Sequence, residues 1–556
     1  MTAVTLTFLY AYVVIARYDD LPTAFFRLQD RYVIGCFVVA LGFWSFAGTR
    51  RFGGAFRLDC AAFLIIGVSA IWVLSLWAGA HLVMDNYALT RDEHMVDFDM
   101  GVFRSGHLAA PLAAAWRPLA EALVPHFLLD IPDHAGLVSS YMPMNAALRA
   151  GFEFLADPAL LNPLLAGVGL VALYQVARRL FGVDRETQAV VLLMFVTSAQ
   201  VIVGAMTNYA MTSHLAFNLI WLALFLRNTR ASHGAALGIG FVATGLHQVV
   251  FHPLFVAPFL PYLVHRGAWR TALFYALGYL AIGLFWLSYP YLVVSVGGFA
   301  SAGAPGTAAG PLAFVTTRVI PLIVERDPAE LVMMVSNLLR FSAWQNMALI
   351  PLALLALPVA RSDEGIARPL YHGILLTVLV MFVLMPFQGH GWGYRYLHGF
   401  IGSFALLAGY GWRSVGEERG MARSLVRVAT VVTTVIAIPL ILWTTHGFVH
   451  PYARVDAAIS RIQADFVIID TEPIPFAIDE VRNPADLSAR PIRLSSKALG
   501  PADLGGLCAR GRIAFVARRD MQTLGLGLDH PPMSPRFDAL RMSTPVACQV
   551  APVTLR

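Results

Sequence analysis

The sequence predicts an all-α polytopic membrane protein of about 13 transmembrane helices with a small C-terminal α/β extracytoplasmic domain. Mean hydropathy is +0.65 over 556 residues, and 58% of the residues are hydrophobic while only 13% are charged. Apolar runs of about bilayer length recur along the chain, as transmembrane helices require. The basic residues lie mainly in short loops between these runs, so the net charge of +6 indicates membrane topology and no nucleic-acid partner.

The apolar runs set the order of the predicted spans. They lie at about 4–16, 32–48, 60–83, 160–177, 187–206, 212–226, 235–251, 253–265, 271–289, 343–360, 369–387, 398–412 and 426–446. Arginine-rich loops between them, such as 361–368, fall on one side, which the positive-inside rule assigns to the cytoplasm. We therefore expect a multi-pass membrane protein with a cytoplasmic N-terminus.

Three regions follow from this topology. Residues 1–59 hold two additional N-terminal spans, 60–446 form a transmembrane core, and 447–556 form an extracytoplasmic α/β domain. The long loops 84–159 and 290–342 then lie on the same outer face as the C-terminal domain. Long loops on a rigid scaffold commonly carry function, so the active face is expected to be the outer one.

The C-terminal region shows a helix and two strands. Residues 452–463 are expected to be helical, and 465–470 and 512–516 have the pattern of buried strands. No glycine-rich phosphate loop follows either strand, so the region is interpreted as a docking or acceptor-handling domain, with a catalytic role as the alternative. Whether Cys508 and Cys548 are bonded stays open, because a disulfide requires an oxidising compartment.

Four carboxylates follow the third apolar run, in Arg91-Asp-Glu-His-Met-Val-Asp-Phe-Asp99. In a helix, Asp92 and Asp99 share one face at i and i+7, and Glu93 and Asp97 form an adjacent stripe at i and i+4. Acids beside a membrane are electrostatically unfavourable, so such a cluster often marks an ion, proton or catalytic site.

These acids have three candidate roles. Asp92, followed by Glu93, is the candidate general base that deprotonates an acceptor hydroxyl. Asp97 and Asp99 are candidate ligands for a divalent cation such as Mg²⁺ or Mn²⁺, although no cofactor is certain. The alternative is a solvated helix end, in which Asp92 and Glu93 interact with the positive end of the helix dipole.

A second group of polar residues lies in His390-Gly-Trp-Gly-Tyr-Arg-Tyr-Leu-His398. Arg395 is a candidate donor to a phosphate, assisted by His390 and His398, and the glycines permit close backbone approach. Such a group would stabilise the charge on a lipid-phosphate leaving group. The alternative is that Arg395 and the neighbouring aromatic residues form an interfacial anchor.

Three segments together resemble the GT-C superfamily of membrane glycosyltransferases, in the branch of the protein mannosyltransferases and the lipid A aminoarabinose transferase. Leu89-Thr-Arg-Asp-Glu93 resembles the acidic motif of that branch, and Ser139-Ser-Tyr-Met-Pro-Met-Asn145 its Tyr-Pro-Pro segment. Asn162-Pro-Leu-Leu through Ala177-Arg-Arg-Leu-Phe-Gly182 resembles the span that follows. The likeness covers roughly residues 60–450.

The resemblance implies an inverting enzyme that takes a sugar from a polyprenyl-phosphate donor on the extracytoplasmic face. It implies that Asp92 is the base and that Arg395 contacts the donor phosphate. The acceptor would be an envelope glycan, lipid or protein, and the protein would lie in a bacterial inner membrane, with membrane lipids around its core. The rival hypothesis is a transporter or lipid flippase coupled through the outer acids, and an inactive scaffold is a third reading. Transporters commonly show internal repeats, and no apolar block here recurs with matched breaks.

Overall fold

The computed structural model divides into two compact units. It describes residues 9, 11–13, 21–46, 62–123, 127–129, 131–299, 324, 327–362, 365–415, 419–472, 477–526 and 534–550. The first unit comprises 1–80, 159–287 and 309–444, and the second 81–158, 288–308 and 445–556. The predicted first span at 4–16 and the glycine-rich part of the 290–342 loop lie largely outside the described residues.

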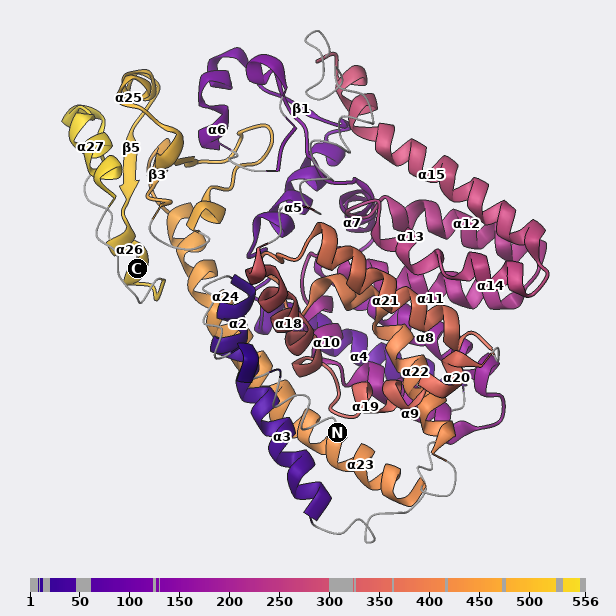
Figure 1. Ribbon diagram of the computed structural model, residues 1–556. Coiled ribbons are helices and arrows are strands. Elements are labelled where there is room, and N and C mark those ends of the chain that lie inside the picture. The colour runs from indigo at the N-terminus through magenta and orange to yellow at the C-terminus, as the bar shows by residue number, and fades with distance from the viewer. Residues whose placement is uncertain are drawn as a thin grey trace. The chain divides into compact units, whose positions relative to one another are not determined.

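The first unit is a helical bundle (Figure 1). Its elements, some of which run on into the second unit, are α2 (Leu21–Phe25), η1 (Phe26–Asp30), α3 (Arg31–Phe46), α4 (Ala62–Leu82), α8 (Leu161–Phe181), α9 (Arg185–Val196), α10 (Ala199–Ala205), α11 (Met211–Arg227), α12 (Arg230–Thr244), α13 (Phe251–Val256), α14 (Phe259–His265), α15 (Trp269–Val296), α18 (Pro328–Ala343), α19 (Leu349–Leu355), α20 (Leu357–Arg361), α21 (Ala367–Leu384), η8 (Arg395–Phe400), α22 (Ile401–Ser414), α23 (Arg419–Val432), η10 (Thr433–Ala437) and α24 (Ile438–Ser460). Helix α11 packs on α8, and α22 packs on α9 and α19. Gly411 of α22 lies against the Leu352 carbonyl of α19, where a Cβ would clash. Small residues permit such close helix approach in membranes.

Five helices among the described residues are long and apolar enough to cross a membrane. They are Ile65–Leu82, Pro158–Phe181, Trp269–Val296, Ala367–Leu384 and Gly420–Ser460. The bent pair Arg185–Val196 and Ala199–Ala205, with 53° between its helices, makes a sixth if it counts as one span. The polytopic membrane class is thus confirmed, and each of these segments matches a predicted apolar run.

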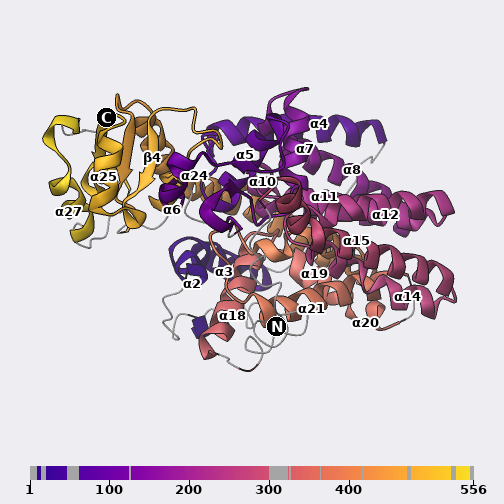
Figure 2. The ribbon, with the colours of Figure 1, turned by 90° about the horizontal axis from the view of Figure 1, so that it is seen from above.

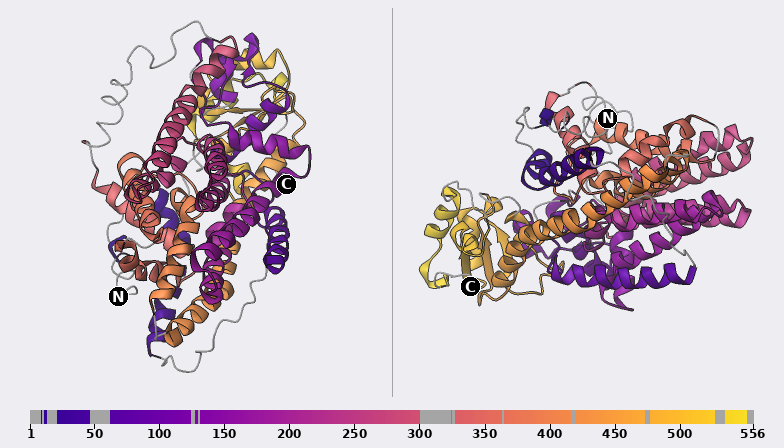
Figure 3. Two further views of the ribbon diagram at one scale, coloured as in Figure 1. Left: turned by 90° about the vertical axis from the view of Figure 1, so that its right-hand side faces the viewer. Right: turned by 90° about the horizontal axis from the view of Figure 1, so that it is seen from below.

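The predicted total of about 13 spans is not confirmed. Several predicted runs form short helices, because proline removes a backbone donor and ends or bends a helix. The run at 253–265 divides into α13 and α14 around Pro258, and the run at 343–360 contains α19 and the start of α20. In contrast, Gly420–Ser460, which runs through α23, η10 and α24, is one helical stretch of 41 residues, seen as a long rod in Figure 3. At 1.5 Å per residue it exceeds a bilayer core of about 30 Å.

The second unit combines the 84–159 loop with the C-terminal region. Its further elements are α5 (Arg91–Arg104), β1 (Ala110–Pro111), η3 (Ala114–Leu119), α6 (Ala120–Leu123), η4 (Pro132–His134), β2 (Gly136–Leu137), α7 (Met144–Glu153), η5 (Pro158–Leu160, which continues into the first unit), β3 (Phe466–Ile469), η11 (Ala477–Glu480), β4 (Ile492–Ser495), η12 (Ser496–Ala498), α25 (Pro501–Cys508), β5 (Ile513–Val516), α26 (Arg518–Gln522), α27 (Pro535–Ser543) and η13 (Val546–Cys548). Strands β1 and β2 pair antiparallel. The other three strands form a parallel sheet in the order β4-β3-β5, with Phe466 opposite both Ile492 and Ile513.

The parallel sheet shares its hydrophobic core with the loop. Helix α25, labelled in Figure 2, lies in the connection from β4 to β5, because parallel strands need a crossover connection. Phe98 of α5 and Leu123 of α6 belong to the same buried cluster as Ile468, Leu494 and Ile513 of the strands. A three-stranded sheet exposes two apolar faces, so the loop supplies surface that the C-terminal region lacks. Cys508 and Cys548 form a disulfide with a Cα–Cα distance of 5.6 Å.

Candidate functional site

The predicted acidic segment forms helix α5. Thr90 and Glu93 make a capping box: the Glu93 Oε2 accepts from the Thr90 backbone N–H at 3.5 Å and from its hydroxyl at 3.4 Å. Two backbone donors at a helix start need such partners, which is why Thr-x-x-Glu starts a helix here. Glu93 is fully buried, whereas Asp92 is partly exposed.

Asp92 and Asp99 both contact the segment that contains Ser139 and Tyr141. The Tyr141 hydroxyl donates a hydrogen bond to Asp92 Oδ1, and Ser139 donates one to Asp99. The predicted i and i+7 relationship is thus confirmed, because the two acids on one face of α5 meet the same neighbouring segment. This contact brings together the acidic motif and the Tyr-containing motif that carried the family resemblance.

Asp99 is a buried carboxyl group in a narrow pocket. Phe103, Leu108, Val138, Tyr289 and Val293 line the pocket together with Asp99, Ser139 and Tyr141. Burial raises the pKa of Asp99 to about 7, and the hydrogen bond from Ser139 opposes that rise. Asp99 therefore exchanges its proton near neutral pH.

Glu93 and Asp97 share a different partner, Arg149 of helix α7. Arg149 is 1% exposed, donates to the Pro158 carbonyl at 2.8 Å through Nη1, and has no hydrogen-bond partner among the described residues for Nε or Nη2. Burial lowers the pKa of Arg149, and the charges of Asp97, Glu93 and Asp157 oppose that shift. The second predicted stripe of acids is thus also confirmed, and it is balanced by a buried cation.

A buried ionic network holds the start of α5 against the C-terminal region. The Arg91 Nε lies 3.2 Å from Asp479 Oδ1, and Arg91 Nη2 donates to the Ile478 carbonyl at 2.6 Å. Burial lowers the pKa of Arg91 to about 10, so it stays charged at neutral pH while Asp479 opposes the shift. Arg91 Nη1 also lies 2.6 Å from Nδ1 of His94, whose pKa burial lowers well below its usual value.

Asp97 and Asp99, the candidate cation ligands, face different partners. Residues two apart point to nearly opposite sides of a helix. Accordingly, Asp99 lies by Ser139, whereas Asp97 acts on Arg149. Among the described residues, the group of three or more ligand-type side chains close enough to hold an ion does not include them. Their metal role stays a prediction.

The 388–398 loop, with the candidate phosphate residues, belongs to the first unit. Gln200 Nε2 donates to the Tyr394 carbonyl at 2.8 Å, and Tyr209 donates to the His390 carbonyl at 3.1 Å. Arg340 donates to the Gly391 carbonyl at 2.7 Å and pairs with the buried Asp30 at 2.7 Å. These bonds, from α10, α18 and the turn that contains Tyr209, fix the backbone of the loop.

Arg395, His390 and His398 are all buried in this unit, with exposed fractions of 9%, 4% and 2%. The Arg395 guanidinium lies 5.6 Å from the ring centre of Tyr209 and 5.5 Å from that of Tyr396. The His390 ring packs edge-on against Trp392 at 4.7 Å, and the His398 ring lies over Gly204.

The glycines of the loop leave room for the Arg395 side chain. A Cβ at Gly391 would lie 3.1 Å from Arg395 Cδ, and one at Gly389 would lie 3.6 Å from its Nη2. His398 Nε2 is buried without a hydrogen-bond partner in the described part of the chain. The backbone of the loop therefore packs closely around the Arg395 side chain. The anion-binding role of Arg395 stays a prediction.

Two residues of the acidic site were missed by sequence reasoning. Tyr141 lies in the segment 139–145 that resembles the family, but nothing in the sequence indicated its hydrogen bond to Asp92. Arg149 is one arginine in an otherwise apolar turn, Ala146-Ala-Leu-Arg-Ala150. That isolation was the available signal, since a lone cation in an apolar stretch needs a buried anionic partner.

Comparison with known proteins gives a likeness among solved structures. No protein-family model and no curated protein sequence matches the chain. Two crystal structures of ArnT from Cupriavidus metallidurans are similar, one bound to undecaprenyl phosphate and one in the apo state. The first has 15% identity, covers 76% of this chain and 85% of that chain, and gives a TM-score of 0.47. The second has 15% identity, covers 74% and 84%, and gives 0.42.

Proposed function

We propose that the chain is an inverting glycosyltransferase that uses a polyprenyl-phosphate-linked sugar. The observation that carries the proposal is the hydrogen bond from Tyr141 to Asp92, a partly exposed acid in the first turn of α5. It joins the two motifs that resemble the family, in a chain whose described residues include five or six helices able to cross a membrane. The acceptor is an envelope glycan, lipid or protein on the extracytoplasmic face.

Asp92 is the general base of the proposed reaction. Its carboxylate takes the proton of the acceptor hydroxyl as the hydroxyl oxygen attacks the anomeric carbon of the donor. The bond between that carbon and the phosphate oxygen breaks, the configuration inverts, and polyprenyl phosphate leaves with the electron pair. The helix dipole favours the negative charge of Asp92 at this position, and Tyr141 orients its carboxylate.

Glu93 has a positioning role in this proposal. It is fully buried, caps α5 through Thr90 and lies in the field of Arg149. A carboxylate in that position holds the first turn of α5, and with it the side chain of Asp92. A direct catalytic role for Glu93 would require an acceptor to reach a fully buried group.

Arg395 is proposed to hold the donor phosphate, assisted by His390 and His398. Its burial supports this role, because a guanidinium removed from bulk water interacts strongly with an anion. The developing charge on the leaving phosphate would be stabilised by this cation. A divalent cation bound by Asp97 or Asp99, such as Mg²⁺ or Mn²⁺, remains part of the proposal, and activity measured with and without EDTA tests it.

The substitution Asp92→Asn tests the catalytic assignment. A strain that carries the variant in place of the native chain is assayed for its surface glycans by mass spectrometry, with membrane protein levels measured in parallel. We expect a loss of about 10²- to 10⁴-fold in transfer rate, the usual contribution of a general base. The matched control is Glu121→Gln, an exposed acid of α6 in the same unit.

Full glycan output from a stably expressed Asp92→Asn protein would contradict the proposal. A separate assay tests the rival hypothesis of a transporter or flippase. The purified chain in liposomes is tested for movement of a solute or lipid without polyprenyl phosphate, and such movement would favour a transporter or flippase.

A further inference from the structure

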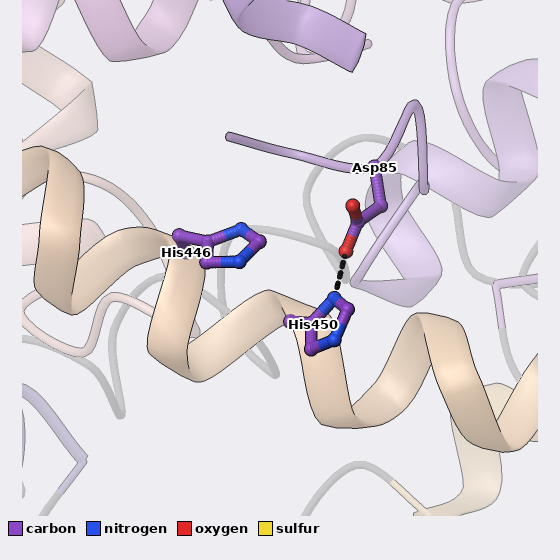
Figure 4. A group of neighbouring side chains, drawn as sticks. All are labelled: Asp85, His446 and His450. Carbon is purple, nitrogen blue, oxygen red and sulfur yellow. Dashed lines mark hydrogen bonds and ion pairs between the residues drawn. The ribbon is translucent and has the colours of Figure 1, made fainter. Parts of the chain in front are cut away.

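Three ligand-type side chains gather in the second unit outside the acidic site. They are Asp85, from the turn after α4, and His446 and His450 of α24 (Figure 4). One ligand atom from each residue lies within 4.8 Å of the others. His446 and His450 are four residues apart, so both project from the same face of the helix.

The hydrogen bond made by His446 leaves one of its ring nitrogens able to bind a metal ion. His446 Nδ1 lies 3.1 Å from the Val83 carbonyl oxygen, which can only accept, so Nδ1 carries the proton and Nε2 keeps its lone pair. Metal-binding histidines are commonly oriented in this way by a backbone carbonyl. His450 Nδ1 lies 2.7 Å from Asp85 Oδ2, and the two imidazole rings lie 4.8 Å apart.

The turn that carries Asp85 has an unusual backbone. Asp85 and Asn86 adopt φ values of +52° and +47°, in the left-handed region that aspartate and asparagine tolerate better than most residues. Figure 4 shows that the Asp85 carboxylate points from this turn toward His450. Two consecutive residues in this conformation place the carboxylate beside the helix face that presents both imidazoles.

We propose that Asp85, His446 and His450 bind a divalent transition-metal ion of the Zn²⁺ class, with water in the remaining position. Two imidazole nitrogens and one carboxylate oxygen suit Zn²⁺ and its neighbours, whereas Mg²⁺ and Ca²⁺ prefer oxygen ligands alone. Bonds of about 2.0–2.2 Å bring tetrahedral ligands to roughly 3.3 Å from one another. The side chains of His450 and Asp85 are 44% and 26% exposed, so they have room to rotate and an ion has access.

The bound ion would hold the segment that leads into α5. Asp85 lies five residues before Thr90, the residue that caps α5, and in the same segment Tyr87 donates to Glu480 at 2.8 Å. Fixing Asp85 to α24 therefore shortens the free length of chain before Asp92. The ion acts as a structural tie for the acidic helix, and its binding does not depend on the proposed reaction.

The experiment uses the full chain, purified in detergent with an affinity tag free of histidine, stripped with EDTA and desalted. Zn²⁺ or Co²⁺ is then added, and the ions retained per chain are counted by elemental mass spectrometry. We expect one ion per chain, the visible absorption of four-coordinate Co²⁺, and no retention of Mg²⁺. His446→Ala and His450→Ala should each lower Zn²⁺ affinity by at least about 10-fold. The control variant, His107→Ala, removes an exposed histidine of the same unit and should bind as the native chain does.

Two results would overturn the proposal. One is a native chain that retains no stoichiometric ion at micromolar Zn²⁺, and the other is a His446→Ala/His450→Ala double variant that binds Zn²⁺ as the native chain does. If the alanine variants do not fold, the native chain and Asp85→Asn decide. The thermal unfolding midpoint of the native chain should fall with EDTA and recover with Zn²⁺ but not with Mg²⁺, and that of Asp85→Asn should respond less. Identical midpoints of the native chain with and without Zn²⁺ would then reject the site.

Discussion

Tyr141 donates a hydrogen bond to Asp92 across 49 residues of sequence. Ser139, two residues before Tyr141, donates a hydrogen bond to Asp99, which lies on the same face of α5. One short segment therefore contacts both acids of that face, one partly exposed and one buried. Asp92 is thus accessible from solvent, whereas Asp99 titrates inside the protein.

The Tyr141→Phe variant should slow the proposed transfer. The change removes the hydroxyl that orients Asp92 and keeps the ring, which lies 5.3 Å from the ring of Phe127. A hydrogen bond to a charged group contributes about 1.5–3 kcal/mol, so we expect kcat to fall by about 10- to 100-fold. Steady-state kinetics checks this, with Tyr371→Phe in the first unit as the control. An unchanged kcat would show that Asp92 needs no orientation by Tyr141.

The Asp99→Asn variant should change how stability depends on pH. Burial raises the pKa of Asp99 from 3.8 to about 7, so between these values the folded protein binds a proton that the unfolded chain releases. The stability contributed by protonated Asp99 is complete below pH 3.8, declines as pH rises toward 7, and is absent above it. The difference amounts to about 1.4 kcal/mol for each unit of pKa shift.

Asparagine stays neutral, so Asp99→Asn should gain stability relative to the native chain as pH rises from 4 to 7. Thermal unfolding midpoints measured across this range check the prediction. Asp133→Asn, at an exposed position of the same unit, is the control. Parallel pH profiles for the native chain and Asp99→Asn would mean that the buried carboxyl does not titrate there.

The Arg149→Met variant should be strongly destabilised. Methionine fills much of the volume but leaves Glu93 and Asp97 without the cation that balances them. Removing one partner from a buried ionic group costs about 3–5 kcal/mol. Denaturant unfolding measures this, and adding Glu93→Gln should restore part of the loss by removing one of the stranded charges.

A suitable comparison for that variant is Arg104→Met. Arg104 pairs with Glu153 at 3.3 Å, but its side chain is 54% exposed. Exposed pairs contribute about 1 kcal/mol or less, so this variant should stay near the native stability. Equal losses for the two arginines would contradict the burial argument.

The Gly391→Ala variant should weaken binding of the proposed lipid donor. Its Cβ would lie 3.1 Å from both Arg395 Cδ and Gln388 Nε2, so the Arg395 side chain must shift. A displacement that costs about 1.4 kcal/mol raises the donor KM about 10-fold. Gly234→Ala in α12 is the control, because a Cβ there meets nothing within 4 Å. A native KM for Gly391→Ala would exclude a role for the Arg395 position in donor binding.

The disulfide provides a test of the proposed topology. Cys508 and Cys548 should resist alkylation until a reductant is added, because the bond persists only in an oxidising compartment. Cys36 is free and intermediate in exposure, so it serves as an internal reference after denaturation. Mass spectrometry of the alkylated peptides checks the prediction. Free thiols at both positions in freshly isolated membranes would place the C-terminal region in the cytoplasm.

Helical and strand periodicity made part of this protein predictable from sequence. A helix brings positions i and i+7 to one face whatever surrounds it. That Asp92 and Asp99 lie on the same face of α5 therefore followed from their spacing alone. Strands β3 and β5 were predicted as continuous apolar runs. Strand β4 was missed, because Arg493 interrupts its pattern. The Arg493 guanidinium is buried because it bonds to Asp456 Oδ1 at 2.6 Å, to Ser460 Oγ at 2.7 Å and to the Glu480 carbonyl at 3.0 Å.

The sequence by itself determined the membrane class, most of the long spans and the acidic helix. Only the tertiary structure decided that Tyr141 meets Asp92, that Arg149 balances Glu93 and Asp97, and that Asp85 lies beside two histidines of α24. The reason is physical. Local patterns are encoded by backbone geometry over a few residues, whereas contacts between distant segments depend on how the whole core packs, and no spacing in the sequence expresses that.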